Sequence, residues 1–254
     1  MARARPQRLE EEGVWVIPDD DRHHPPRSAD ELEDPWPPCA EMLLARRVAR
    51  DVVADRVAVV LAAGPEHGAV VRGSDPVLVV LGDMAETVGQ GPAHDVLATG
   101  RPSAVEDLHA GAWRWPLLVG TFAVPEQLRS LLLLPLRGQG GRDDGHDVFG
   151  VLVLARDRPL LFTPAQVTTA LRGSALLSAM VMARTLASGD GAAAGEDLDS
   201  LLDPRTDLVP QAVGVLAQRH GLTGDDAHRQ LQATAFAAGR TTQHCAQLLL
   251  EQMR

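Results

Sequence analysis

The chain contains no lysine and no tyrosine, and its only cysteines are Cys39 and Cys245. All of its positive charge is arginine, which we interpret as the bias of a GC-rich genome. The two cysteines lie far apart in the sequence, and so few of them favour a reduced, cytoplasmic protein. No apolar run approaches membrane-spanning length; the best candidate, residues 131–136, has the size of a strand and contains Pro135. The charged N-terminus lacks the apolar segment of a secretory signal.

Basic residues are outnumbered by acidic ones, and the formal net charge is −10. This balance disfavours general affinity for nucleic acids. Catalytic motifs are missing too: there is no nucleophile-elbow serine and no cysteine pair, and the glycine turn at 138–141 lacks the lysine of a phosphate loop. The histidines are scattered singly or without metal-ligand spacing. We therefore predict a protein that is not an enzyme and has no cofactor and no metal site.

Composition divides the chain into four parts. Residues 1–37 carry acidic clusters and many prolines, which predict a poorly ordered tail. Its one apolar patch, Val14–Ile17, is either incidental or a segment that docks on a neighbour. Residues 38–187 have the patterning of a globular domain, residues 188–203 have the composition of a linker, and residues 204–254 form a helical module.

The globular part alternates strands with helices. A helix is predicted from Cys39 to Asp55, and a hairpin follows from the strands Arg56–Ala62 and Gly68–Arg72. Asp75 caps the next helix, and a glycine-rich turn leads into a short one. Further strands are predicted at 102–106, 128–136 and 148–155, the last two joined by a polar loop at 138–145. Thr163–Gln166 caps a final helix with an inner stripe of Val167, Ala170, Leu171, Leu177 and Val181.

Several motifs occur in this order: Gly89-Gln-Gly-Pro92, Gly100-Arg-Pro102, Glu106-Asp-Leu108, Arg114-Trp-Pro116, Leu134-Pro-Leu136 and Phe149–Leu154. This series resembles the GAF domain, a sensor of small molecules or of protein partners. The resemblance implies an α+β fold in which helices flank an antiparallel sheet. Ala93 stands where a cysteine is common in related proteins, so thiol chemistry is not expected at that point.

The resemblance also implies a cavity between the sheet and its crossover segments. We expect Trp113, Trp115, Phe122 and Leu131 to form its walls. His94, Asp95, Asp107 and Arg114 are the expected polar residues at its edge. The alternative is that both tryptophans fill the core without any ligand, since an aromatic-poor chain needs its few rings for packing.

The C-terminal module shows three amphipathic helices. The first spans Val209–Gly221, the second begins at a cap on Thr223, and the third begins at Thr241 or Thr242. Small residues at the expected contacts predict a compact three-helix bundle. Gly214 lies inside the first helix, where glycine is unfavourable, so we expect it to allow a close helix contact.

This module resembles the ANTAR domain of bacterial transcription antitermination regulators. The resemblance rests on Gln211–Leu216, Arg219-His-Gly221, Ala227 with Leu231, and then Ala235, Arg240 and Ala246. It implies an all-α RNA-binding domain that, as a dimer, holds hairpins in a nascent transcript and prevents termination. The order of the two resemblances is that of actinobacterial GAF–ANTAR proteins.

The predicted RNA-binding residues are Arg219, Arg229 and Arg240, because the module has no lysine. A homodimer is expected, with Leu176, Met180 and Met182 of the final sensor helix at the contact; no membrane partner is expected. The alternative is a protein-interaction regulator whose ANTAR-like module has lost RNA binding. Arginines gathered on one exposed face would favour RNA binding. Arginines scattered and paired with Asp225 or Asp226 would favour the alternative.

Overall fold

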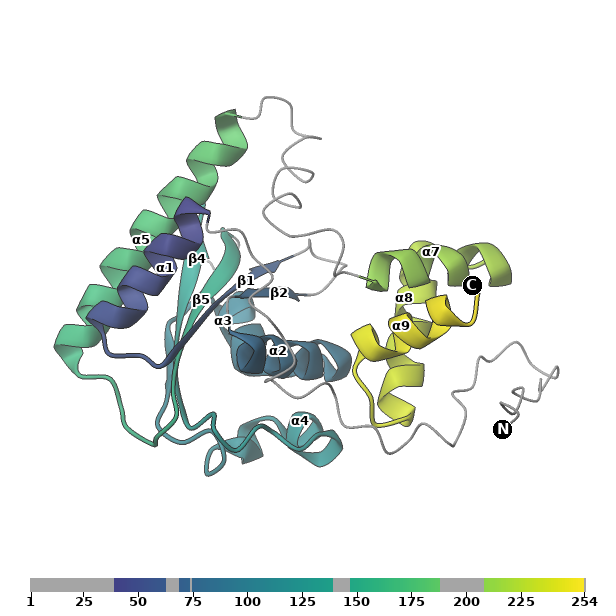
Figure 1. Cartoon of the computed structure of the whole chain (residues 1–254), viewed down its shortest axis with the longest axis horizontal. Helices are drawn as coiled ribbons and strands as arrows, with labels where there is room; N and C mark the ends of the chain where they lie inside the picture. The colour runs from purple at the N-terminus through teal and green to yellow at the C-terminus, as the bar shows by residue number, and fades with distance from the viewer. Residues whose placement is uncertain (1–38, 63–68, 74, 139–146, 188–207, 254) are drawn as a thin grey trace, which may run out of the picture. The chain divides into compact units, whose positions relative to one another are not determined.

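The computed structural model describes residues 39–62, 69–73, 75–138, 147–187 and 208–253 (Figure 1). They belong to two compact units, which we describe one at a time. The predicted tail, the polar loop between the two last strands and the predicted linker lie outside the described residues. In the described part of the chain, no helix is both long and apolar enough to cross a membrane.

The first unit is built on a five-stranded antiparallel sheet. Its strands are β1 (Arg56–Ala62), β2 (Ala69–Gly73), β3 (Ser103–Val105), β4 (Ser130–Arg137) and β5 (Val148–Arg156), in the spatial order β2-β1-β5-β4-β3. The predicted pairing of β1 with β2 is confirmed, with Val60 opposite Val71. The central strand β5 pairs with both β1 and β4, and it places Val153 opposite Ala58 on one side and Leu133 on the other.

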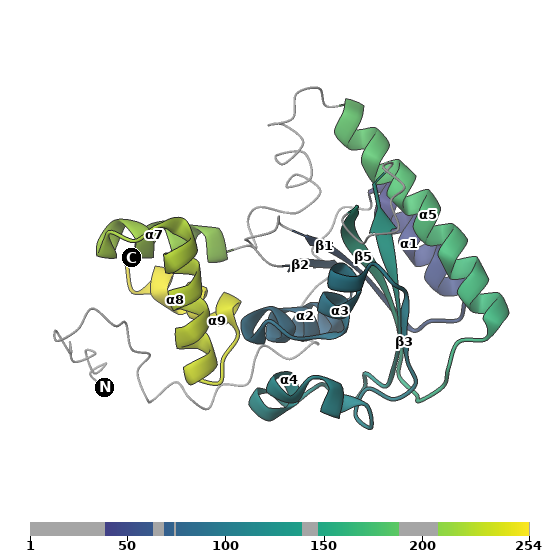
Figure 2. The same ribbon diagram turned by 180° about the vertical axis from the view of Figure 1, so that it is seen from behind.

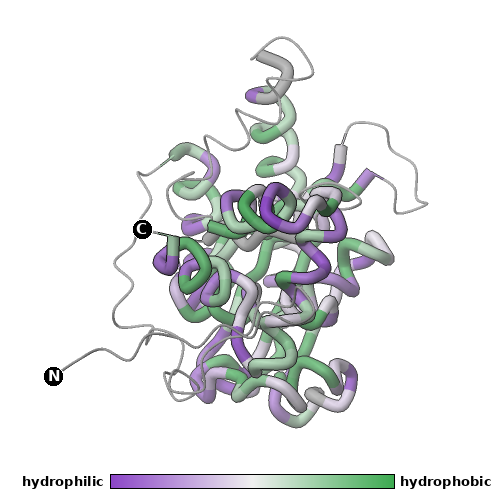
Figure 3. The backbone as a smooth tube through the Cα atoms, turned by 90° about the vertical axis from the view of Figure 1, so that its right-hand side faces the viewer, coloured by the Kyte–Doolittle hydropathy of each residue, from purple (hydrophilic) through white to green (hydrophobic). Residues whose placement is uncertain are grey.

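Helices cover both faces of this sheet (Figures 1 and 2). One face carries α1 (Ala40–Asp51) and α5 (Pro164–Ala187). The other carries α2 (Pro76–Val88), α3 (Pro92–Thr99), a 3₁₀ turn (Ala112–Arg114) and α4 (Pro116–Thr121). Successive strand residues alternate between the two cores, so Ala58 and Val60 pack under α2 while Val57 and Val59 pack under α1 and α5. Figure 3 colours the backbone by the hydropathy of each residue, with hydrophobic stretches in green and hydrophilic ones in purple.

Two helices begin at the caps predicted from the sequence, whereas the first helix ends at Asp51 and not at Asp55 as predicted. The Asp75 carboxylate accepts hydrogen bonds from the N–H groups of Val77 and Leu78 and so caps α2. At the start of α5, the Thr163 N–H donates to Gln166 Oε1 and the Gln166 N–H donates to Thr163 Oγ1, which is a reciprocal capping box.

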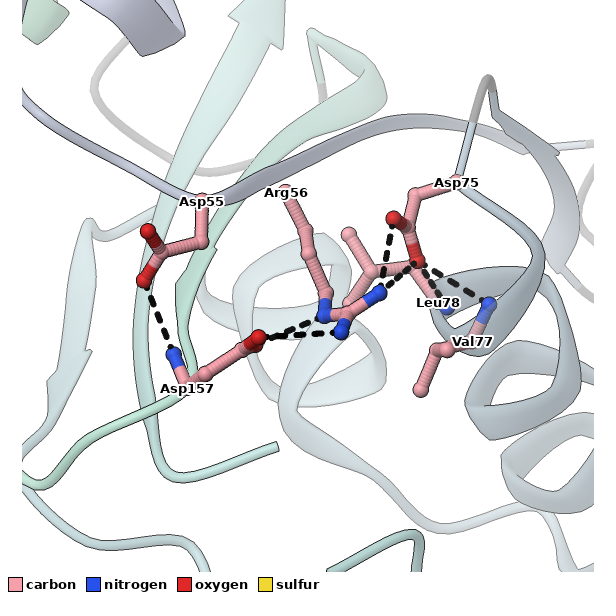
Figure 4. Close-up of polar contacts among 6 residues, drawn as sticks. All are labelled: Asp55, Arg56, Asp75, Val77, Leu78 and Asp157. Atoms are coloured by element: carbon pink, nitrogen blue, oxygen red, sulfur yellow. Dashed lines mark hydrogen bonds and ion pairs between the residues drawn. The ribbon is translucent and has the colours of Figure 1, made fainter. Parts of the chain in front are cut away.

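The Asp75 cap belongs to a larger polar cluster, shown in Figure 4. Arg56 lies between two carboxylates: its Nε and Nη2 donate to Asp157 at 2.7 and 3.0 Å, and its Nη1 donates to Asp75 at 3.0 Å. Burial opposes the charge of Arg56, but the two carboxylates outweigh it and raise the guanidinium pKa. Asp55 completes the cluster by accepting from the Asp157 N–H at 3.0 Å. The cluster joins the first residue of β1 to the end of β5 and to the start of α2.

The contact between α1 and α5 depends on a glycine. A Cβ on Gly173 would overlap Val48 Cγ2 and lie 3.0 Å from Val48 Cγ1, so only glycine lets the two helices approach this closely. The helices are antiparallel there, since Arg184 near the end of α5 reaches Glu41 at the start of α1.

The inner face of α5 differs from the prediction at one position. Ala170, Leu177 and Val181 are buried, but Leu171 is 41% exposed. Two serines take part of the inner face instead, because their hydroxyls bind the adjacent strand. Ser174 donates to the Pro135 carbonyl, and Ser178 accepts from the Arg137 N–H. The serines were missed because hydropathy alone places the leucine inside.

A buried arginine holds the turn after α1 to the segment before α5. Arg156 donates to the carbonyls of Val52 and Val53 and to those of Leu160 and Leu161. Desolvation lowers the pKa of its guanidinium. Val53 has φ 57°, an unusual conformation for a β-branched residue, and its side chain is 60% exposed. The described backbone is strained at this exposed turn.

The second unit is the predicted three-helix bundle of α7 (Val209–His220), α8 (Gly224–Ala237) and α9 (Thr242–Glu251). Its core consists of small and aliphatic residues, namely Ala212, Leu216, Ala227, Leu231, Ala235, Cys245, Ala246 and Leu249. Gly221 ends α7 with φ 65°, and the hydroxyls of Thr223 and Thr241 cap the other two helices. The prediction for Gly214 is wrong: it is exposed, and an added Cβ would meet no described heavy atom within 4 Å.

Candidate functional site

A small cavity lies in the first unit between the sheet and the helices α2 and α3. Its volume is about 30 Å³, and its walls are mostly apolar, with Ala58, Leu131 and Val153 on the sheet side and Leu81 on α2. Sites for drug-sized ligands measure roughly 300–1,000 Å³, whereas one water needs about 10–15 Å³. In this conformation the cavity therefore has room for a group of the size of water.

His94 is the polar residue of this lining. Its Nε2 lies 3.5 Å from Glu86 Oε2 on α2. Its Nδ1 is buried without a hydrogen-bond partner among the described residues. The ring therefore keeps one nitrogen unpaired beside the cavity, and its predicted role as a ligand contact stays a prediction.

Three other predicted residues form a network beside α3. The Asp95 carboxylate accepts a hydrogen bond from Trp115 Nε1 at 3.1 Å. It also forms an ion pair with Arg114 at 3.2 Å. The Arg114 guanidinium also stacks over the Trp115 ring at 4.7 Å. Trp115 is only 2% exposed and belongs to the core. The network fixes the start of α4 against α3 rather than lining the cavity.

The Gly89-Gln-Gly-Pro92 motif has a structural explanation. Gly89 ends α2 with φ 64°, and Pro92 opens α3. A Cβ on Gly91 would lie 2.6 Å from Ala85 Cβ, so the chain passes too close to α2 for any side chain there. The Gln90 side chain accepts a hydrogen bond from the Leu117 N–H and thereby ties this turn to α4.

The remaining predicted residues lie away from the cavity. Trp113 is 79% exposed, so it does not form a cavity wall, and Phe122 packs in the core. Asp107 forms an ion pair with Arg129 at 2.7 Å. The hydrogen bond from Arg129 lowers the pKa of the Asp107 carboxyl. The two tryptophans, separated only by Arg114, thus have opposite environments, because residue 113 of the 3₁₀ turn points outward and residue 115 after the turn is buried.

The three predicted RNA-binding arginines have different surroundings in the bundle. Arg219 is exposed at the end of α7. Arg229 pairs with Asp226 at 2.8 Å on the surface of α8. Hydrogen bonds from Thr223 and Arg229 lower the pKa of the Asp226 carboxyl. Arg240, just before α9, is only 6% exposed. The described bundle therefore presents no exposed face on which all three guanidinium groups meet.

The described residues contain no group of three or more His, Cys, Asp or Glu side chains that could hold a metal ion. Burial in the bundle core raises the pKa of the Cys245 thiol to about 12, against the opposing charge of Arg240. A thiol with this pKa is protonated at neutral pH and is a poor nucleophile.

Comparison with known protein families assigns both units. The sequence model of the GAF domain matches residues 42–181, which is more than half of the chain. The chain belongs to the GAF domain family. The model of the ANTAR domain matches residues 205–250, so a GAF domain is followed by an ANTAR domain. Both are regulatory domains.

Some solved structures are similar to part of the chain at low sequence identity. One similar structure is the GAF domain of a phosphoenolpyruvate-protein phosphotransferase from Acinetobacter, with 18% identity, a TM-score of 0.44, and coverage of 59% of this chain and 83% of that one. Another is a type II free methionine-R-sulfoxide reductase from Thermoplasma acidophilum, with 11% identity, a TM-score of 0.35, and coverage of 55% and 92%. No curated protein matches the sequence.

Sequence reasoning missed several residues of the GAF site. Gly82 and Ala85 line the cavity from α2, and Gln90 and Arg129 fix its surroundings. Two small residues three positions apart in an otherwise bulky helix are the signal for a hollow beside α2. Arg129 carried no comparable signal, because its partner Asp107 is distant in the sequence.

Proposed function

We propose that the chain is a signal-responsive RNA-binding regulator of transcription antitermination. The observation that carries this proposal is the order of domains, a GAF domain followed by an ANTAR domain. In this account the ANTAR bundle binds hairpins of a nascent transcript, and the GAF domain senses a small molecule or a protein partner.

The sensor half of the proposal concerns the cavity beside His94. Its small volume means that any ligand larger than water must displace α2 or α3 from the sheet. Such a displacement would move Gln90 and the Asp95 network, which connect these helices to α4. A ligand in the cavity would therefore change the outer surface of the GAF domain. Asp107 and Trp113 lie outside the cavity and Phe122 packs in the core, so our proposal gives none of the three a contact with a cavity ligand.

The proposed regulator acts as a homodimer, which places two ANTAR bundles on one RNA. Leu176 is 53% exposed on α5, and Met180 and Met182 are partly exposed on the same helix. Apolar side chains on the outside of a long helix favour pairing with a second copy. Leu176→Glu should then shift the mass measured by light scattering at micromolar concentration toward the monomer, and a wild type that is monomeric there contradicts the dimer.

The proposed RNA contacts are Arg219, Arg229 and Arg240. With so few cations, the slope of log K against log salt concentration should be shallow, at about −0.7 to −0.9 per phosphate contact. The test is an anisotropy titration of an RNA with two tandem hairpins, comparing wild type with the double variant Arg219→Ala and Arg240→Ala. Weaker binding by the double variant supports these residues, and unchanged affinity removes them from the site.

A second candidate function is favoured by a specific observation. Arg229 is neutralised by Asp226, and the three arginines do not form an exposed patch. This arrangement fits a bundle that serves protein interaction or dimerisation after the loss of RNA binding. Failure of the wild type to bind the tandem-hairpin RNA, with the dimer intact, would favour this second function.

A further inference from the structure

Arg240 has a hydrogen-bonding edge that no described group fills. Its side chain is 6% exposed, and its Nε and Nη2 atoms are buried without a hydrogen-bond partner among the described residues. Its Nη1 contacts His244 Nε2. A buried guanidinium with unpaired N–H groups costs folding free energy, and binding of an anion would offset that cost.

The same edge is filled in two other arginines of the chain. Arg56 uses Nε and Nη2 to hold the two oxygens of Asp157, and Arg129 uses Nε and Nη2 to hold those of Asp107. These two N–H groups form a fork that matches a carboxylate or a phosphate. In Arg240 alone of these three, the fork is buried and empty.

The position of the fork adds a second feature. Arg240 directly precedes Thr241, the N-cap of α9, and the contact with His244 holds the guanidinium beside the first turn of that helix. The N-terminus of a helix carries partial positive charge and favours anions. No carboxylate of the described bundle supplies one, Asp225 included, because Nε and Nη2 have no hydrogen-bond partner; Asp226 is held by Arg229, and Glu251 accepts from Gln247.

We infer that Arg240 and the first turn of α9 form a binding site for one phosphate group, which is covered in the present conformation. The inference rests on the proposed function, because an RNA backbone supplies phosphates at every nucleotide. Since the free N–H groups are buried, covering side chains must move before a phosphate reaches them. RNA binding would then require this site to open. That opening is a step that the signal sensed by the GAF domain can control.

The first test uses the full-length chain and inorganic phosphate, with chloride of equal ionic strength as the reference. The variants are Arg240→Gln and the matched control Arg158→Gln, since Arg158 is an exposed arginine of the GAF domain. Alkylation of the fully buried Cys245 reports unfolding of the bundle, a larger change than the local movement of side chains that uncovers the phosphate site, and the unfolded bundle does not bind phosphate. Phosphate at ten times its Kd should slow alkylation about tenfold in wild type and control. The rate in Arg240→Gln should not respond, and an equal response there overturns the site.

A variant that keeps the charge covers the case in which Arg240→Gln does not fold. Arg240→Lys retains a cation but lacks the Nε–Nη2 fork. Circular dichroism shows whether its bundle is intact. A folded Arg240→Lys bundle with a weaker phosphate response supports the fork, whereas a full response overturns it.

The second test separates RNA from free phosphate. The tandem-hairpin RNA is titrated at 50 and 200 mM salt with wild type, Arg240→Gln and Arg158→Gln. Loss of one phosphate contact should make Arg240→Gln less sensitive to salt, so that wild type loses about threefold more affinity over this range. Equal affinity and salt dependence overturn the inference and leave the proposed function standing. If the wild type does not bind the RNA, but phosphate still slows alkylation in a way that requires Arg240, the phosphate site is supported. Its ligand is then free phosphate or a phosphorylated small molecule.

Discussion

Two glycines inside helices should respond in opposite ways to the same substitution. In Gly173→Ala the new Cβ overlaps Val48 Cγ2, whereas in Gly214→Ala it enters open space. Overpacking of a core costs about 1–3 kcal/mol, and replacing helical glycine by alanine gains about 1 kcal/mol. We therefore expect Gly173→Ala to destabilise the GAF domain by about 1 kcal/mol and Gly214→Ala to stabilise the bundle by up to about 1 kcal/mol.

Separate probes make this comparison possible in one chain. All four tryptophans lie outside the ANTAR bundle, and the buried Trp115 reports unfolding of the GAF domain. The expected loss lowers the fluorescence midpoint of Gly173→Ala by about 2–4 °C. Alkylation of Cys245 follows the bundle, and Gly214→Ala should slow it.

A double variant tests the steric cause. Val48→Ala alone leaves a hole and should cost about 2 kcal/mol. Combined with Gly173→Ala, the new methyl group occupies part of that hole, so the double variant should be more stable than the sum of the two changes by about 1–2 kcal/mol. A rise in the midpoint for Gly173→Ala, or strict additivity with Val48→Ala, would refute the close helix contact.

Three further predictions follow from the polar and strained positions. The lowered pKa of Asp107 means that its pair with Arg129 stabilises the fold above pH about 4. The advantage of wild type over Asp107→Asn in denaturant titrations should therefore shrink as the pH falls below about 4 and through the lowered pKa, and an advantage that does not change with pH would argue against a stabilising ion pair. With a pKa of about 12, Cys245 has roughly one thiolate in 10⁴ at pH 8, so mass spectrometry should find it unlabelled by iodoacetamide until the bundle unfolds. Val53→Asn should raise the GAF midpoint by about 2–4 °C, because asparagine tolerates the positive φ better than valine, and an unchanged or lower midpoint would mean that position 53 is not strained.

Features set by neighbours in the sequence could be predicted from it. Asp75, Thr163 and Thr241 cap their helices as expected, because a cap depends on groups two or three residues away. The order of the sequence motifs also led to both domain families. These predictions rest on local hydrogen bonding and on resemblance, and neither requires knowledge of distant contacts.

Features set by packing could not be predicted in the same way. Gly214 and Gly173 have the same helical propensity, and only the distant Val48 explains why one of them is required. Trp113 and Trp115 are two residues apart, yet the first is exposed and the second is buried. For the same reason the predicted cavity walls lay partly in the wrong place, since the hollow depends on how α2 and α3 meet the sheet.

Crosslinking in the host cell tests the central proposal most directly. Ultraviolet light joins protein to bound RNA, and sequencing of the purified complexes identifies the transcripts. The proposed function predicts enrichment of RNA with paired hairpins ahead of terminators, and a loss of that enrichment in the Arg219→Ala and Arg240→Ala double variant. Recovery of no RNA above the level of an unrelated protein would contradict the assignment of the ANTAR bundle as an RNA-binding domain.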